Sequence, residues 1–260
     1  MIRITVVTIT YNAEAVLQRT LQSVLRQTYK GVEHLIIDGA SKDGTLKMAE
    51  DYKNESDQSD RGHKVIIKSE PDRGIYDAMN KGLMQASGDY IVFMNAGDCF
   101  PKDDTLEQVV RRCRLSECPS DELPGVLYGL TDIVDDEGRY LRPRRLQPPS
   151  QLNWRSFRHG MLVCHQAFIA RRDLAPQYDL RYRYSADFDW CIRVLQVSPV
   201  NAYVGDQPII SYLNDGLTTS NHRASLRERY DIMCHYYGTL PTMLRHVGFA
   251  GRHLWRKITS

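Results

Sequence analysis

Short apolar runs alternate with amphipathic stretches through the first hundred residues of the chain. The runs are rich in β-branched residues and have the length of strands that are buried on both faces of a sheet. They lie at residues 2–8, 35–37, 65–67 and 90–94. Between them, apolar residues recur at helical spacing, as at residues 16–25 and 75–86, and predict amphipathic helices. This alternation predicts βαβ units and therefore an α/β fold around a mostly parallel sheet.

The other elements are less regular. Asn12 is expected to cap the first helix, and residues 53–63, which are polar and lack periodicity, are expected to form an exposed loop. Further elements are a strand at 126–129, a hairpin turn at 135–138, strand character within 161–170 and a helix at 188–197. The chain contains no linker long enough to separate two domains.

Polar clusters follow the four predicted strands at their carboxyl ends. They contain Thr8, Tyr11 and Asn12; Asp38 to Asp43; Asp72 and Arg73; and Asn95 to Asp98. Ligands of open parallel sheets bind beyond these strand ends, so we expect the clusters to meet on one rim. Neither glycine-rich phosphate-binding motif occurs, which argues against NAD enzymes and P-loop NTPases. The carboxylate of Asp98 could instead hold Mg²⁺ or Mn²⁺ beside a diphosphate, or it could merely cap a turn.

Composition and charge narrow the classes of protein. The 260 residues carry 34 basic and 32 acidic side chains, and a net charge of +2 is too balanced for a protein that coats nucleic acid. The sequence contains no uninterrupted stretch of about twenty apolar residues, so no membrane-spanning helix is expected. The N-terminus does not resemble a signal peptide, so a cytoplasmic location is expected. The 6 cysteines form no CxxC pair and are expected to be reduced.

Four motifs, in this order, resemble family 2 glycosyltransferases of the GT-A fold. They are Thr8-Ile9-Thr10-Tyr11-Asn12, the segment 38–45 (DGASKDGT), Ser87-Gly88-Asp89-Tyr90-Ile91, and Asn95-Ala96-Gly97-Asp98. The segment 70–82 (EPDRGIYDAMNKG) resembles the subgroup that builds bacterial O-antigen, capsule and exopolysaccharide. The resemblance implies a Rossmann-like, mostly parallel central sheet flanked by helices, a smaller mixed acceptor-side region and a helical C-terminal tail.

The resemblance also implies roles for the residues of the rim. Tyr11 would stack on or flank a nucleotide base, Asp38 would accept a hydrogen bond from the base imide, and Asp72 would lie near the base or ribose. The full set implied for nucleotide-sugar binding is Thr8, Tyr11, Asn12, Asp38, Ser41, Asp72, Arg73, Asn95 and Gly97. Asp98 stands where the family has its last metal-ligating aspartate, which implies Mn²⁺ or Mg²⁺. Because the preceding motif position is Ala96 or Gly97 and not an aspartate, metal affinity without the nucleotide is expected to be weak.

A second acidic motif of the same family resembles a segment of this chain, Ser185-Ala186-Asp187-Phe188-Asp189-Trp190. It implies Asp187 as the general base that deprotonates an acceptor hydroxyl, with Asp189 as the alternative or as an orienting partner. His165 and Gln166 stand at a His-Gln pair of the subgroup near the acceptor, although a structural histidine fits equally well. The segment 216–223 resembles a loop that closes over the donor. There Arg223 or His222 would neutralise the diphosphate and His222 could bind the metal, or neither has a role.

The resemblance implies one catalytic domain at 1–225, with a nucleotide-binding half at 1–100 and an acceptor half at 101–225, followed by a helical basic extension at 226–260. Such an enzyme would be an inverting glycosyltransferase. It would move a sugar from a nucleoside diphosphate-sugar, with UDP favoured, to a hydroxyl of a lipid-linked glycan in bacterial surface polysaccharide synthesis. A sugar nucleotidyltransferase and a non-catalytic sugar-nucleotide-binding module are the alternatives.

Basic and apolar residues interleave at the C-terminus. The basic residues are Arg245, His246, Arg252, His253, Arg256 and Lys257, and the apolar residues are Leu244, Val247, Phe249, Leu254 and Trp255. This pattern is typical of a helix that lies on a membrane surface, here the inner face of the cytoplasmic membrane. It fits an ordinary surface helix equally well.

Overall fold

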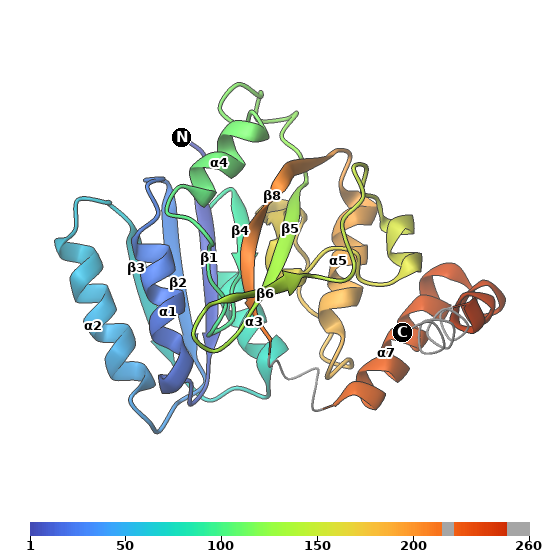
Figure 1. Ribbon diagram of the computed structural model, residues 1–260, viewed down its shortest axis with the longest axis horizontal. Coiled ribbons are helices and arrows are strands. Elements are labelled where there is room, and N and C mark those ends of the chain that lie inside the picture. Colours follow the sequence, from blue (N-terminus) through green and yellow to red (C-terminus); the bar gives the residue numbers. More distant parts are fainter. Residues whose placement is uncertain (215–220, 249–260) are drawn as a thin grey trace.

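The structure is a computed structural model that describes residues 1–214 and 221–248 (Figure 1). Its first half is a parallel sheet in the order β3-β2-β1-β4. The strands are β1 (Ile4–Thr10), β2 (Val32–Asp38), β3 (Lys64–Ser69) and β4 (Tyr90–Phe93), connected by helices α1 (Glu14–Leu25), α2 (Thr45–Gln58) and α3 (Ile75–Gln85). β1 and β2 pair in register up to Thr10 and Asp38, so their carboxyl ends finish side by side.

Side chains of β2 alternate between the two faces of this sheet, as the pleat of a strand requires. Leu35 and Ile37 belong to the large core cluster that includes α3, whereas Ile36 packs in a second cluster with Leu17 of α1 and Tyr52 of α2. Both faces are therefore covered by helices, which explains why the strands are apolar throughout and confirms the predicted βαβ arrangement.

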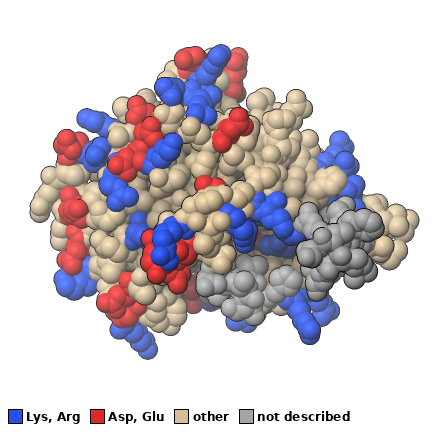
Figure 2. Space-filling view, viewed as in Figure 1, with Lys and Arg blue, Asp and Glu red and all other residues tan. Residues whose placement is uncertain are grey.

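Opposite charges are interspersed on the outer surface of α2. Lys47 pairs with Asp51 at 3.1 Å and Lys53 pairs with Asp57, both at the helical spacing of four. Figure 2 shows the same mixture of acidic and basic side chains over this part of the molecule. Exposed pairs of this kind contribute little to stability and keep a helix face soluble.

The second half extends the sheet with strands that run in both directions. They are β5 (Val126–Val134), β6 (Tyr140–Pro143), β7 (Phe168–Arg171) and β8 (Asn201–Leu213). β7 is antiparallel to both β4 and β5, and β8 is parallel to β5, so one mixed sheet runs through both halves. The seam is narrow, because β4 and β7 share the two pairs Tyr90–Arg171 and Ile91–Ala170. The expected mixed region after residue 100 is thereby confirmed.

The helices of the second half complete the fold. They are α4 (Thr105–Arg112), α5 (Ala186–Val197) and α7 (His222–Tyr237), with 3₁₀ turns at Trp154–His159, His165–Ala167 and Arg172–Leu174. Residues 239–248 form a further helix, and in Figure 1 it lies with α7 at the opposite end of the molecule from α2. None of the helices within the described ranges is long and apolar enough to cross a membrane.

Four local expectations were wrong. The helix α2 continues to Gln58 through most of the expected loop, because Tyr52 and Ser56 are buried one turn apart. Asn12 does not cap α1, which begins at Glu14 after Ala13. Strand character starts at Phe168 rather than 161. β8 was not expected at all, since Gly205 and Pro208 interrupt its apolar pattern and its register shifts against β5.

Candidate active site

The loops after β1 and β2 are joined where the two strands end. The Asn12 amide donates to Ser41 Oγ at 2.8 Å, and the Lys42 amide donates to Asn12 Oδ1 at 2.9 Å. Asn12 adopts a left-handed conformation with φ of 46°, which asparagine tolerates better than most residues. Asn12 and Ser41 therefore lie together on the rim, as the sequence predicts, and each fixes the loop of the other.

Asp38, the last residue of β2, binds the loop that follows β2 and the end of β3. Its carboxylate is fully buried and accepts hydrogen bonds from the Ser41 amide at 3.0 Å, from the Ser41 hydroxyl and from the Ser69 hydroxyl at the end of β3. A buried carboxylate needs such donors, and three of them hold it in one orientation. The Asp38 carboxylate thus holds the loop and the strand end together at the rim. Its expected contact with a nucleotide base stays a prediction.

Tyr11 and Asp72 meet at Gly39. A Cβ atom on Gly39 would lie 2.5 Å from Asp72 Oδ2 and 3.3 Å from Tyr11 Cδ2, so only glycine leaves both side chains in place. Tyr11 is 62% exposed, and the Gly74 amide donates to Asp72 Oδ1 at 2.8 Å. An exposed aromatic ring beside a fixed carboxylate is suited to a flat, polar ligand such as a nucleotide base. Neighbouring Arg73 is instead paired with Asp77 at 2.8 Å.

Two buried oxygen atoms at the strand ends have no hydrogen-bond partner among the described residues. They are Thr10 Oγ1, after which β1 ends, and Asn95 Oδ1, in the loop after β4. The two loops are close, since the Ala96 amide reaches the Ile9 carbonyl at 3.4 Å. Unpartnered buried oxygens are costly, and a bound ligand with hydroxyl groups would satisfy them. Thr10 lies in the motif at residues 8–12 but is not among the residues that the sequence predicts to bind the nucleotide-sugar.

Asp98 is turned into the protein. Its Oδ1 accepts from the Leu213 amide at 3.0 Å, its Oδ2 accepts from Gln166 Nε2 at 2.9 Å, and the residue is 3% exposed. Burial raises the pKa of Asp98 to about 7, so the neutral acid is well populated near neutral pH. The preceding Gly97 has φ of 100° and packs on Leu213, where a Cβ would lie 2.6 Å from Cδ2. The Asp98 carboxylate thus connects the end of β8 to the loop after β4 through its bond to the Leu213 amide.

The described side chains do not by themselves fit a Mn²⁺ or Mg²⁺ site. These cations take several ionised or carbonyl oxygens, whereas both oxygens of Asp98 are used inside the fold. Within residues 1–214 and 221–248, no three His, Cys, Asp or Glu side chains form a group that could hold a metal ion. The metal role of Asp98 therefore stays a prediction that this geometry does not favour.

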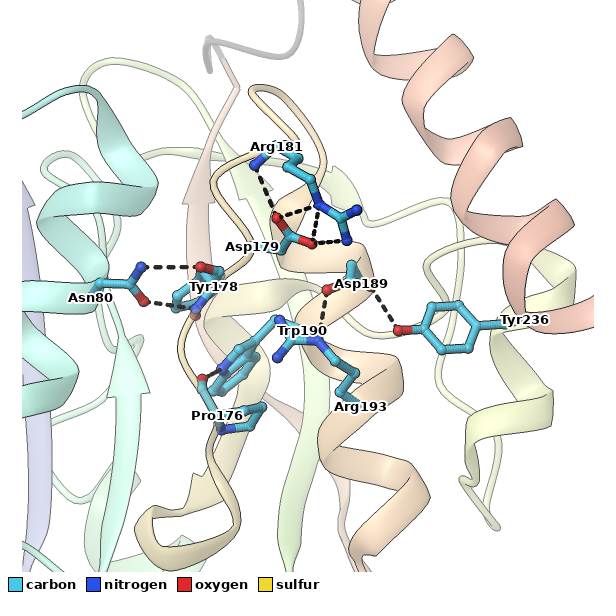
Figure 3. A network of polar contacts seen from close by, with 9 residues as sticks. All are labelled: Asn80, Pro176, Tyr178, Asp179, Arg181, Asp189, Trp190, Arg193 and Tyr236. Atoms are coloured by element: carbon cyan, nitrogen blue, oxygen red, sulfur yellow. Dashed lines mark hydrogen bonds and ion pairs between the residues drawn. The ribbon is translucent and has the colours of Figure 1, made fainter.

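The two carboxylates of the second acidic motif have different surroundings. Asp189 is buried, and it accepts from Arg193 Nε and from the Tyr236 hydroxyl, each at 2.7 Å (Figure 3). Arg193 belongs to α5 itself, so the bond from Tyr236 is the one that ties α5 to α7. Asp187 lies two residues earlier in the first turn of α5, is half-buried, and accepts at Oδ1 from the Tyr76 hydroxyl at 3.1 Å. Of the two, Asp187 is the carboxylate that a substrate can approach.

His165 and Gln166 are parts of the core. His165 Nε2 and the Tyr178 hydroxyl are 2.7 Å apart, and its ring stacks on Phe93 with 5.4 Å between centroids. Burial lowers the pKa of His165, which keeps the ring neutral. Gln166 is occupied by Asp98 and by the Cys164 thiol at 3.0 Å. These contacts favour the structural alternative that the sequence left open for His165.

A continuous set of contacts joins Asp98 to Asp187. Gln166 binds Asp98, His165 beside it binds the Tyr178 hydroxyl, the Tyr178 ring stacks on Tyr76 at 5.6 Å, and Tyr76 binds Asp187. Asn80 holds the Tyr178 backbone through two hydrogen bonds of 2.7 and 3.1 Å (Figure 3).

The pKa of Tyr212 on β8 is raised mainly by burial and further by both Asp98 and Asp187. The contacts from Gln166 to Tyr76 are what connect the two carboxylates.

Tyr76, Asn80, Tyr178 and Tyr212 were missed by the sequence reasoning. Tyr76 and Asn80 stand four residues apart within the segment 70–82, and that helical spacing was the available signal.

Two expected residues do not join this arrangement, and the side chain of a third is not described. Thr8 is fully buried inside the sheet, where its hydroxyl bonds to His34 Nε2 at 2.9 Å, so the side chain does not reach the rim. Arg223 is exposed in the first turn of α7. His222 begins the same helix, but its side chain, like residues 215–220 of the expected donor loop, lies outside the described part of the chain.

Solved structures share this fold. The S. aureus TarS fragment 1–349 in complex with UDP-GlcNAc superimposes with a TM-score of 0.67 over 89% of this chain and 64% of that one, at 18% identity. The mannosyltransferase PcManGT from Pyrobaculum calidifontis, in complex with GDP-Man and Mn²⁺, gives a TM-score of 0.61 over 96% and 75%, at 16% identity. At such identities the likeness establishes the GT-A fold alone.

Sequence relatives add the family. A PGL/p-HBAD biosynthesis glycosyltransferase of Mycobacterium bovis is 35% identical over 187 residues, which are 71% of this chain and 66% of the relative. An uncharacterized glycosyltransferase of Mycobacterium tuberculosis is 33% identical over 199 residues, 75% of this chain and 69% of that protein. The family described as Glycosyl transferase family 2 matches residues 5–178. The chain belongs to glycosyl transferase family 2.

Proposed function

We propose that the chain is an inverting glycosyltransferase that uses a nucleoside diphosphate-sugar and transfers the sugar to a hydroxyl group. The observation that carries the proposal is the setting of Asp187. It is a half-buried carboxylate in the first turn of a helix, where negative charge is favoured, and the Tyr76 hydroxyl fixes its orientation. A general base in acyl or glycosyl transfer needs this combination of access and fixed orientation.

The donor would bind along the rim. The nucleotide base would lie against Tyr11 beside Asp72. Hydroxyl groups of the nucleotide-sugar would donate hydrogen bonds to the Thr10 and Asn95 oxygens, which have no partner among the described residues. A UDP-sugar is favoured, with support from the TarS complex with UDP-GlcNAc, although the PcManGT complex contains GDP-Man. The positions of Asn12, Ser41 and Asp38 would keep the two loops of this pocket in place.

The transfer step follows from the position of Asp187. The acceptor hydroxyl gives its proton to the Asp187 carboxylate as its oxygen forms a bond to the anomeric carbon, and the bond from that carbon to the diphosphate oxygen breaks. Attack from the face opposite the leaving group inverts the anomeric centre, and no covalent sugar–enzyme intermediate forms. The products are the glycosylated acceptor and a free nucleoside diphosphate.

For the acceptor we propose a class of molecule rather than one compound. The relative in M. bovis is named for PGL/p-HBAD biosynthesis, which supports an acceptor in glycolipid or surface polysaccharide synthesis. A lipid-linked glycan of the O-antigen or capsule type, reached at the inner face of the cytoplasmic membrane, is the form we propose. Residues 1–225 would be the catalytic domain and residues 226–260 the extension that approaches the lipid.

A screen of donors tests the proposal. Release of free nucleoside diphosphate is measured from UDP-, GDP- and dTDP-sugars, with and without Mn²⁺, which also decides the metal requirement. Asp187→Asn should lower transfer by about a hundredfold or more while nucleotide binding persists. Asp179→Asn is the matched control, since Asp179 pairs with neighbouring Arg181 at 2.6 Å and should leave transfer intact. Undiminished transfer in Asp187→Asn would refute the assignment, and binding without any transfer would favour the non-catalytic module.

A further inference from the structure

The helix at residues 239–248 carries its apolar side chains on the outside. Leu240, Met243, Leu244 and Val247 are 62%, 48%, 63% and 67% exposed. Their spacing of three, four and seven residues places them on one side of the helix. We call these four side chains the apolar stripe. A helix at the surface of a folded protein normally turns such a stripe toward the core.

The opposite side of this helix is polar and faces the protein. Thr242 is fully buried, Arg245 Nη1 lies 3.3 Å from His159 Nδ1, and the His246 ring packs edge-on against Tyr230 at 5.1 Å between centroids. The polarity of the helix is therefore inverted relative to the fold that carries it. Apolar side chains exposed to water cost free energy, so an outward-facing stripe of this kind indicates a surface that binds another apolar phase.

The size of the stripe and the charge around it distinguish the possible occupants. The stripe exposes on the order of 400 Å², about half of what each partner contributes to a stable protein–protein interface. The sequence that follows it is basic, with Arg252, Arg256 and Lys257 within ten residues of Val247. A narrow apolar stripe followed by cationic side chains matches a bilayer surface with anionic headgroups.

We propose that residues 239–248 dock this chain on an anionic phospholipid membrane, with the apolar stripe in the interface between headgroups and acyl chains. The contact does not depend on the transfer reaction, and it names the surface through which the proposed lipid-linked acceptor would be approached. This helix lies with α7 at the end of the molecule opposite α2, so that end would face the membrane, and the bond from Tyr236 to Asp189 connects it to α5.

Flotation of the full chain with vesicles tests the docking. Vesicles of phosphatidylglycerol with phosphatidylcholine should carry the protein, vesicles of phosphatidylcholine alone should carry much less, and high salt should reduce the difference. Met243→Glu, and Leu244→Glu with Val247→Glu, should each lower the bound fraction at least about tenfold, because charge is poorly accepted in the interface. Met84→Glu is the matched control, since Met84 is 65% exposed on α3, far from the stripe in sequence.

Two further measurements separate a loss of docking from a loss of folding or of transfer. Thermal melting of the variants should match that of the unaltered chain, because the substituted side chains are exposed. Nucleoside diphosphate release with a water-soluble acceptor should also be unchanged, so failure of the docking and failure of the transfer proposal can be told apart. Binding that survives the stripe substitutions, absence of binding to anionic vesicles, or a dimer in light scattering that these substitutions dissociate would each overturn the proposal.

Discussion

Replacing Gly39 with alanine tests whether Tyr11 and Asp72 belong to one nucleotide site. Gly39 is not among the residues with positive φ, so alanine imposes no backbone strain there. The added methyl group would lie 2.5 Å from Asp72 Oδ2, well inside van der Waals contact. Since the Gly74 amide holds the other carboxylate oxygen at 2.8 Å, Asp72 can move only by giving up its orientation.

The size of the effect follows from the bond that Asp72 would lose. A hydrogen bond to a charged group contributes about 1.5–3 kcal/mol. Displacing Asp72 should therefore weaken nucleotide binding by about ten- to a hundredfold. The free energy of unfolding should change much less, because the strain is relieved by movement of one side chain at the surface rather than by a shift of the core.

Isothermal titration calorimetry with UDP measures this difference directly. Gly248→Ala is the control, since a Cβ at Gly248 meets no atom of the described residues within 4 Å. In a chain that already carries Asp72→Ala the methyl group has room, so adding Gly39→Ala should change Kd by less than about twofold. Equal Kd values for Gly39→Ala and the unaltered chain, or an equal loss in both backgrounds, would refute the placement of the nucleotide base.

Two predictions concern stability. Burial alone would raise the pKa of Glu33, but hydrogen bonds from Ser87, Lys64 and Thr5 outweigh it and lower the pKa from its ordinary 4.5 to about 2. The ionised side chain therefore contributes about 3 kcal/mol that is present above pH 4.5 and is lost as the pH falls toward 2. Urea unfolding across this range should show that loss in the unaltered chain and not in Glu33→Gln, and parallel curves would contradict it. Tyr236→Phe should lower the free energy of unfolding by about 2 kcal/mol, because Asp189 loses a donor to its buried charge. Tyr140→Phe, at a side chain that is 60% exposed, should cause no loss, and equal effects would count against the bond between α5 and α7.

The first half of the fold could be predicted from sequence because its strands are buried on both faces. Such strands, β2 for instance, are continuous apolar runs, and the polar residues that end them mark the rim. β8 could not be predicted in the same way. It is only partly buried, contains Gly205 and Pro208, and depends on pairing with β5 about 75 residues earlier.

The candidate site was predictable in its location but not in the direction of each side chain. A carboxylate after a strand has the same local sequence whether it faces the rim or the interior. For Asp98 that choice is made by Gln166 and Leu213, which are 68 and 115 residues away. Likewise Thr8 and Thr10 share one face of β1, but Thr8 lies inside the sheet against His34, whereas Thr10 is the last residue of the strand. Long-range contacts of this kind leave no signal in a single sequence.

The narrow seam between β4 and β7 makes ring packing responsible for how the two halves of the fold are held relative to each other. Two residue pairs of backbone resist sliding poorly, so the rigidity depends on rings that pack across the seam, Phe93 against His165 and against Tyr178, with 5.4 and 5.3 Å between centroids. Exchanging one of these rings for a smaller side chain would alter how far the proposed donor pocket lies from Asp187 without changing a residue that the proposal places against a substrate. The aromatic cluster is thus the place where the reach of such an enzyme can be adjusted.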